Sequence, residues 1–93
     1  MSLQVQWTTQ FKKDYKLAIK RGRDIKKLDD TIIMIAKETA LPQKYKDHAL
    51  TGNFIGFREC HIEPDWLLVY AVEQNVLTLT LSRTGSHSDL FGK

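Results

Sequence analysis

The sequence has a single cysteine, Cys60, among its 93 residues. One cysteine excludes an internal disulfide framework and a cysteine-rich zinc site. No apolar run reaches the roughly 18 residues that a bilayer-spanning helix needs. The first ten residues, MSLQVQWTTQ, show no charged segment followed by an apolar one, which is the pattern of a secretory signal. These absences predict a cytoplasmic protein without a membrane contact.

Signatures of several enzyme classes are also missing. No GxSxG motif is present to support a serine nucleophile. The three histidines are separated by 13 and 26 residues, whereas zinc ligands usually occur a few residues apart. A metal site would therefore have to join distant segments, and we predict no metal and no other cofactor. Cys60 lies within a strand pattern, which is typical of a small buried side chain rather than a nucleophile.

Positive charge is concentrated in the first half of the chain. Residues 1–47 contain 11 Lys and Arg against six Asp and Glu, and residues 48–93 contain three against five. The segment FKKDYKLAIKRGRDIKKL alone has eight basic and two acidic residues. A basic half indicates a polyanionic partner, either a nucleic acid or an acidic protein segment. A solvated helix face that only aids solubility would show the same charge pattern.

The first half also has the periodicity of a strand followed by two helices. Residues Leu3–Trp7 alternate between apolar and polar side chains, as in a short strand. Thr8 or Thr9 can cap a helix that follows, and the RGRD segment interrupts the helical pattern before it resumes. So short a connection predicts a helical hairpin. The expected apolar positions of the two helices are Phe11, Tyr15, Ala18 and Ile19, and then Ile25, Leu28, Ile32, Ile35 and Ala36.

The second half changes to the pattern of strands. Three segments rich in apolar and β-branched residues are separated by turn signals, and a final helical turn follows Ser86. Leucines on alternate residues of the last segment predict one apolar face for the helices and one polar, open face. The fold class is therefore α+β, a helical hairpin packed on one face of a mostly antiparallel four-stranded sheet, in one domain over residues 1–93. The order is β-α-α-β-β-β, and the last three strands are expected at Phe54–Ile62, Trp66–Val72 and Val76–Ser82.

Five polar residues near the ends of these strands could together cleave RNA without a metal. His48, His61 and His87 offer imidazoles that titrate near neutral pH, and Asp65 follows His61 in a turn. One group would remove the proton of a ribose 2′-OH, and another would protonate the leaving 5′-oxygen. Arg83 would hold the phosphate through its planar guanidinium. The alternative is structural: surface histidines, an arginine paired with an acidic residue, and aromatic residues that only pack.

Two stretches of the sequence resemble a known family. The segment HALTGNFIGFRECHIEPDWLLVY, from His48 to Tyr70, and the segment RTGSHSDLF, from Arg83 to Phe91, match the pattern of the YafQ branch of the RelE/ParE toxin superfamily. The distinctive pieces are HIEPDW and RTGSH. The resemblance covers nearly the whole chain and implies the RelE-like fold.

The resemblance also implies a function, namely a toxin of a type II toxin–antitoxin pair that cleaves mRNA in the ribosomal A site. His87 would be the general acid, and Asp65 with His48 and His61 would supply and orient the base. Arg83 would bind the scissile phosphate, with Phe91 and Trp66 completing the RNA-binding surface. The implied partners are mRNA, ribosomal RNA and an antitoxin of the DinJ/RelB type, with operator DNA bound only through the antitoxin complex. A ParE-like toxin directed at gyrase, or a binding module without catalysis, is the alternative on the same fold.

Strand alternation places one of these residues on the wrong face. Arg83 is in phase with Leu79 and Leu81, which are expected to face the helices. To reach the polar face with the histidines, the strand must end or bulge near Ser82.

Overall fold

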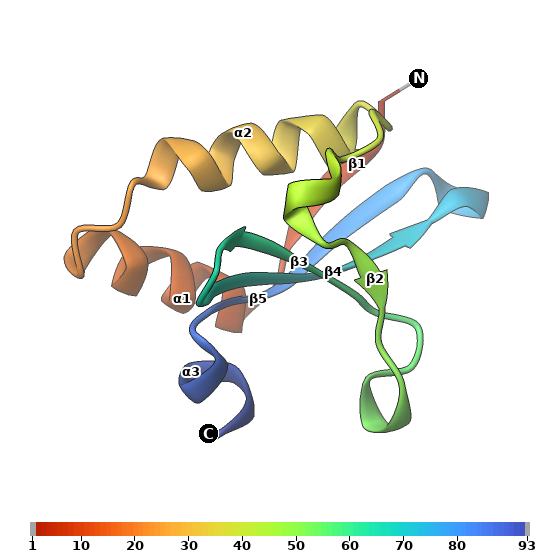
Figure 1. The fold of residues 1–93 in the computed structure, drawn as a ribbon. Helices are drawn as coiled ribbons and strands as arrows, with labels where there is room; N and C mark the ends of the chain where they lie inside the picture. The colour runs from red at the N-terminus through yellow and green to blue at the C-terminus, as the bar shows by residue number, and fades with distance from the viewer. Residues whose placement is uncertain (1, 93) are drawn as a thin grey trace.

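The computed structural model describes residues 2–92. Met1 and Lys93, the end residues of the predicted domain, lie outside the described residues. Two long helices follow the first strand, and the remaining strands and a short helix complete the chain (Figure 1). In this part of the chain, no helix combines the length and the apolar character that a membrane crossing requires. The elements are β1 (Gln4–Trp7), α1 (Thr9–Lys20), α2 (Ile25–Ala36), β2 (His48–Ala49), β3 (Arg58–Glu63), β4 (Trp66–Glu73), β5 (Thr78–Gly85) and α3 (His87–Phe91), with 3-10 turns η1 (Gln43–Tyr45), η2 (Gly52–Phe54) and η3 (Gln74–Val76).

The sheet confirms the predicted α+β class but has five strands instead of four. Its order is β1-β5-β4-β3-β2, with β1 parallel to β5 and the other pairs antiparallel. The additional strand β2 has only two residues, His48–Ala49, which is too short for any alternation to be visible in the sequence. The expected strand Phe54–Ile62 begins later, at Arg58, because Phe54 closes a 3-10 turn and Gly56 has a left-handed φ of 92°.

The helical hairpin forms as predicted, except that Ile19, expected on the apolar stripe of the first helix, is 53% exposed. Thr8 caps α1, since its hydroxyl accepts a hydrogen bond from the backbone N–H of Phe11. Gly22 follows the end of α1 with a φ of 77°, a conformation that glycine adopts without strain. Asp24 precedes α2 but makes no side-chain capping bond. The buried helix residues pack with β4 and β5 into one core, whose members include Phe11, Ala18, Leu28, Ile32, Ile35, Leu68, Leu79 and Leu81.

The other face of the sheet is less open than the sequence predicted. Leu67 and Val69 of β4 point away from the core side chains Trp66 and Leu68, yet both are buried. Helix α3 and the η2 loop lie on this side of the sheet, opposite α2 (Figure 1). The prediction of a wholly polar face was wrong because β4 is the central strand of the five and is covered on both faces.

A bulge in β5 changes the face on which its last residues lie. Tyr70 pairs with Leu81, but the preceding residue, Val69, pairs with Arg83, which leaves Ser82 as the extra residue. Arg83 is therefore in register with Val69 on the face away from the hairpin. The expectation that the strand must bulge near Ser82 for Arg83 to reach this face is confirmed.

Candidate active site

One row of residues crosses four strands on the face away from the hairpin. His48 of β2 is paired with Glu59 of β3, Glu59 with Val69 of β4, and Val69 with Arg83 of β5. Residues directly opposite one another in a sheet point to the same face. The next row along contains His61. Strand pairing thus gathers residues that are distant in the sequence.

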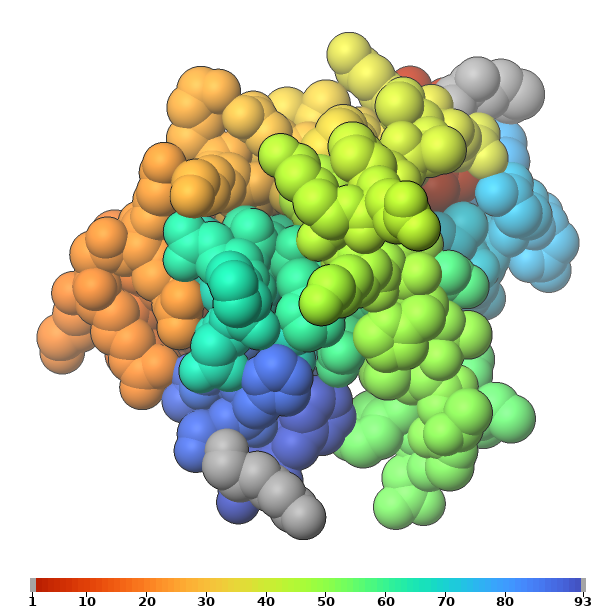
Figure 2. All heavy atoms as spheres, viewed as in Figure 1, coloured from red at the N-terminus to blue at the C-terminus, as the bar shows by residue number. Residues whose placement is uncertain are grey.

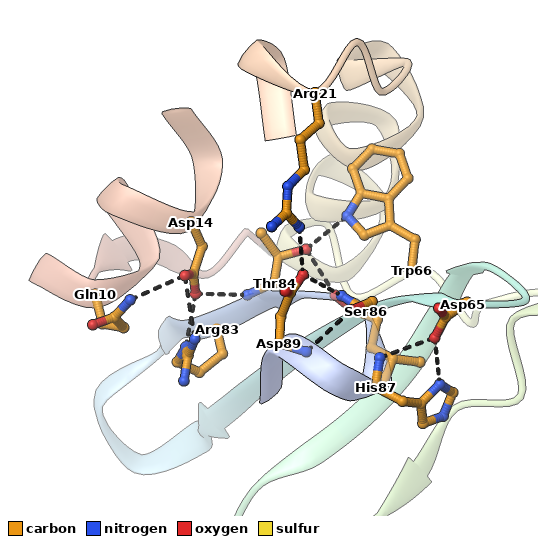
Figure 3. A network of polar contacts seen from close by, with 11 residues as sticks. Gln10, Asp14, Arg21, Asp65, Trp66, Arg83, Thr84, Ser86, His87 and Asp89 are labelled. Atoms are coloured by element: carbon orange, nitrogen blue, oxygen red, sulfur yellow. Dashed lines mark hydrogen bonds and ion pairs between the residues drawn. The ribbon is translucent and has the colours of Figure 1, made fainter. Parts of the chain in front are cut away.

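His87 and Asp65 form a hydrogen-bonded pair at the edge of this face (Figure 3). Ring atom Nδ1 of His87 lies 2.7 Å from Oδ1 of Asp65, and the backbone N–H of His87 donates to the same oxygen at 2.9 Å. Both side chains reach solvent, with His87 47% and Asp65 67% exposed. A carboxylate in this position fixes the ring so that Nδ1 carries a hydrogen and Nε2 faces outward.

The same hydrogen bonds keep Asp65 ionised. They lower the pKa of the Asp65 carboxyl below its ordinary value of 3.8, with the backbone N–H of His87 as the largest cause and the His87 ring as the second. An ionised carboxylate only accepts hydrogen bonds, which requires that His87 be the donor.

Helix α3 is held in place from two directions. The hydroxyl of Ser86 accepts from the backbone N–H of Asp89, and the Asp89 carboxylate accepts from the backbone N–H of Ser86, which together form a capping box. Arg21, just after α1, donates to the same carboxylate at 2.7 Å. A side chain at Gly85 would place its Cβ 3.0 Å from the Asp89 side chain. Gly85 therefore allows α3 to begin immediately after the strand and to present His87.

A buried carboxylate links the other two histidines. Nε2 of His48 and Nε2 of His61 lie 3.5 Å and 3.8 Å from Oε1 of Glu59, whose side chain is 8% exposed. On the far side of each ring, Nδ1 lies near a backbone carbonyl oxygen, that of Lys46 at 2.7 Å for His48 and that of Pro64 at 3.3 Å for His61. Carbonyl oxygens only accept, which places a hydrogen on both Nδ1 atoms. Neither Nε2 forms a hydrogen bond to Glu59 at these distances, so both atoms remain available for chemistry.

The structure brings all three histidines and Asp65 into one cluster. The ring centroids of His61 and His87 are 5.8 Å apart, and Glu59 connects His61 to His48. The partners differ from those expected in one respect, because Asp65 pairs with His87 and not with His61. Glu59 was missed in the sequence. Its position two residues before His61, in phase on the same strand, is the signal that could have identified it.

Arg83 lies on the predicted face, but its guanidinium turns to α1 (Figure 3). Its Nε donates to Oδ2 of Asp14 at 2.8 Å and its Nη2 lies 3.3 Å from Oδ1. The buried Asp14 also accepts from the side-chain amide of Gln10 and from the backbone N–H of Thr84. The guanidinium is thus paired with Asp14 and makes no hydrogen bond to the histidine cluster within residues 2–92.

The two aromatic residues of the expected RNA-binding surface lie in different environments. Phe91 of α3 is half-buried and contacts Phe54 edge to face, with ring centroids 5.5 Å apart. Trp66 is fully buried in the core, and its Nε1–H donates to the hydroxyl of Thr84 at 3.0 Å. The expectation that Trp66 contributes to an RNA-binding surface was wrong, since its ring has no exposed face for a base.

The Asp65–His87 pair makes a prediction about pH. We expect the backbone amide of His87 to titrate with an inflection below pH 3.8, because the Asp65 pKa is lowered in the folded protein. The depressed pKa means that the hydrogen bond is complete above pH 3.8 and is lost as the pH falls through the lower folded value. Amide chemical shifts followed by NMR from pH 7 to pH 2 measure it. In Asp65→Asn the inflection should disappear, and an unchanged titration in that variant would contradict the assignment.

Imidazoles whose rings are fixed by hydrogen bonds at Nδ1 are suited to proton transfer at a phosphate ester. Among residues 2–92, no group of three or more His, Cys, Asp or Glu side chains is arranged to hold a metal ion.

Comparison with known proteins points to one family. Residues 3–92 match the family described as bacterial toxin of type II toxin-antitoxin system, YafQ. The mRNA interferase toxin YafQ of Escherichia coli K12 is 42% identical over 89 residues, 95% of each chain. The crystal structure of the E. coli DinJ-YafQ toxin-antitoxin complex is similar with a TM-score of 0.90 and 39% identity, covering 99% of this chain and 100% of that one. A metal-bound toxin from Helicobacter pylori is similar with a TM-score of 0.90 and 46% identity, covering 96% and 99% of the two chains.

Proposed function

The chain belongs to the YafQ family of toxins from bacterial type II toxin–antitoxin systems, and from this premise we propose that it is a ribosome-dependent mRNA endonuclease. The observation that supports this most directly is the hydrogen-bonded pair of Asp65 and His87. The ring centroid of His87 lies 5.8 Å from that of His61. Two oriented imidazoles at this separation can serve the two proton transfers of RNA cleavage. The curated relative with the same family assignment is named as an mRNA interferase.

The proposed reaction uses the 2′-OH of the message as the nucleophile. Nε2 of His61 takes the 2′-OH proton, and the 2′-oxygen attacks the adjacent phosphorus. The bond from phosphorus to the 5′-oxygen breaks, and Nε2–H of His87 protonates that oxygen. The products are a 2′,3′-cyclic phosphate and a 5′-OH. We assign the base to His61 because its ring is next to that of His87, whereas His48 lies on the other side of Glu59.

In this proposal three charged residues orient the histidines and stabilise the charges that the reaction develops. Asp65 holds His87 through Nδ1 and balances the positive charge of its imidazolium form. Glu59 lies against Nε2 of both other histidines and orients them. Arg83 binds the scissile phosphate through the edge of its guanidinium that Asp14 does not use, and Phe91 borders the site.

Metal ions have no role in the proposed chemistry, since imidazoles supply both proton transfers and the 2′-OH supplies the nucleophile. Because the similar H. pylori toxin is metal-bound, the effect of metal removal on cleavage has to be measured directly.

The proposed partners follow from the family and from the charge distribution. The E. coli relative forms a complex with DinJ, and we propose that an acidic antitoxin of the DinJ/RelB type inhibits this chain. The basic segment over α1 and the start of α2 would contact ribosomal RNA or that antitoxin. Operator DNA would be bound only through the antitoxin complex. Residues 1–93 act as one toxin domain in the cytoplasm, where the translating ribosomes are.

Cleavage of a defined message by the purified protein tests this function. We expect cuts only when 70S ribosomes are present. Treating the protein with EDTA beforehand, at constant ribosomal Mg²⁺, should not change the cleavage rate. No cut should occur where a 2′-deoxynucleotide precedes the bond. Primer extension locates the cuts. Stalled replication with intact messages would instead identify the gyrase-directed alternative, and cleavage lost on chelation and restored by zinc or copper would overturn the metal-free reaction.

A further inference from the structure

A cavity of about 410 Å³ opens beside His61 and is not used by the proposed reaction. Its size is within the roughly 300–1,000 Å³ of pockets that bind small ligands. The η1 segment forms one wall and the β3–β4 turn forms the other, and Figure 2 shows these segments, in yellow-green and teal, next to each other on the face that also carries the dark-blue α3. The lining residues are Lys27, Lys44, Tyr45, Lys46, His61, Ile62, Glu63 and Pro64.

The cavity has the chemistry of a nucleotide site. Tyr45 contributes an aromatic ring, and the ammonium of Lys44 lies over that ring at 5.5 Å from its centroid, a contact that a bound base would replace. Lys27 is neutralised by Glu63 at 2.9 Å, but Lys44 and Lys46 form no ion pair within residues 2–92. An aromatic ring beside two cations that have no acidic partner is the combination that binds a base and the phosphate attached to it.

Two backbone contacts tie the cavity to the histidine cluster. Lys46 lines the cavity, and its carbonyl oxygen holds Nδ1 of His48 at 2.7 Å. Pro64 lines the opposite wall, and its carbonyl oxygen lies 3.3 Å from Nδ1 of His61. Lys46 has a left-handed φ of 50°, which is uncommon for a residue with a side chain and marks a tightly turned backbone at this wall. Lys46 and Pro64 therefore both line the cavity and orient the imidazole rings of His48 and His61.

We propose that this cavity binds the nucleotide on the 5′ side of the cut, the one whose 2′-OH attacks, with its base against Tyr45 and its own 5′-phosphate at Lys44 and Lys46. The side of the cut follows from the lining. His61, which takes the 2′-OH proton, lines the cavity, and His87, which protonates the 3′-side product, does not. The inference rests on the proposed function, because it takes the roles of these two histidines from it.

The test is single-turnover cleavage on ribosomes programmed with synthetic messages. One message is intact, one lacks the base of the nucleotide 5′ of the cut, and one lacks the base 3′ of it. The variants are Tyr45→Leu, which keeps apolar bulk against the core, and Tyr45→Phe, which keeps the ring. Thermal unfolding of each variant verifies the fold, since Tyr45 packs against the core.

For the native protein, removal of the 5′ base should slow cleavage by at least about ten-fold, the size expected for loss of one base–aromatic stack. Tyr45→Leu should cut the intact message about ten-fold more slowly and show no further loss on the message without the 5′ base, whereas Tyr45→Phe should behave as native. The cavity assignment would be overturned if removal of the 5′ base slowed the native protein and Tyr45→Leu by the same factor. It would also be overturned if the effect of Tyr45→Leu depended on the 3′ base instead. In both cases the native protein would still cut the intact message. Failure of the native protein to cut any message would overturn the proposed function as well.

Discussion

Replacing His87 with glutamine is expected to reduce cleavage of ribosome-bound message by about 10²- to 10⁴-fold, the usual contribution of a positioned general acid. Glutamine can still donate a hydrogen bond to Asp65, but it cannot transfer a proton to the leaving oxygen. The backbone N–H of His87, which also binds Asp65, is unchanged by the substitution. We therefore expect growth arrest on expression to disappear while the protein remains folded.

The measurement is single-turnover cleavage together with thermal unfolding of the same preparations. Ser88→Ala is the matched control, because Ser88 is the exposed neighbour of His87 in the same short helix and its side chain makes no hydrogen bond within residues 2–92. It should retain native activity. A His87→Gln protein that still cuts messages at a tenth of the native rate or faster would remove His87 from the role of acid.

The second large effect is expected at Arg83. Arg83→Ala should reduce cleavage by about 10²- to 10³-fold, which is typical for loss of one group that stabilises transition-state charge. The same substitution should lower the free energy of unfolding by only about 1–2 kcal/mol, because the Arg83 side of the ion pair with Asp14 is partly exposed. Asp14 would keep two donors, the Gln10 amide and the Thr84 backbone N–H.

Asp14→Asn separates a phosphate contact from a structural ion pair. This variant removes the negative charge beside Arg83 but keeps the guanidinium and a hydrogen-bond acceptor. If Arg83 binds phosphate, Asp14→Asn should retain most of the native cleavage rate despite a similar loss of stability measured by urea unfolding. Equal loss of activity in the two variants would instead show that Arg83 acts only by holding β5 to α1.

Periodicity was sufficient to predict most of the fold from the sequence. The helical hairpin and the three long strands follow from apolar spacing, which depends on a face of each element being buried. Strand β2 could not be predicted in this way, since two residues have no period and pair only because β3 offers a free edge. The covered second face was missed although WLLVY is apolar on both sides, which is the pattern of a strand buried on both faces.

The site was predicted in its members but not in their partners. The sequence gathers the histidines at strand ends, and the paired strands place them on one face. Which carboxylate binds which ring depends on the turn between β3 and β4 and on where α3 starts, and neither is encoded in spacing. The burial of Trp66 agrees with the structural alternative, in which the aromatic residues only pack.

Each of the three imidazoles is anchored at the same ring atom, two by main-chain oxygens and one by a carboxylate. Their tautomers are thus chosen when the chain folds, before any message arrives. If the protein cleaves messages as proposed, these rings need no rearrangement before catalysis. An inhibitor such as the proposed antitoxin would then have to act by covering the site rather than by holding the rings in another tautomer.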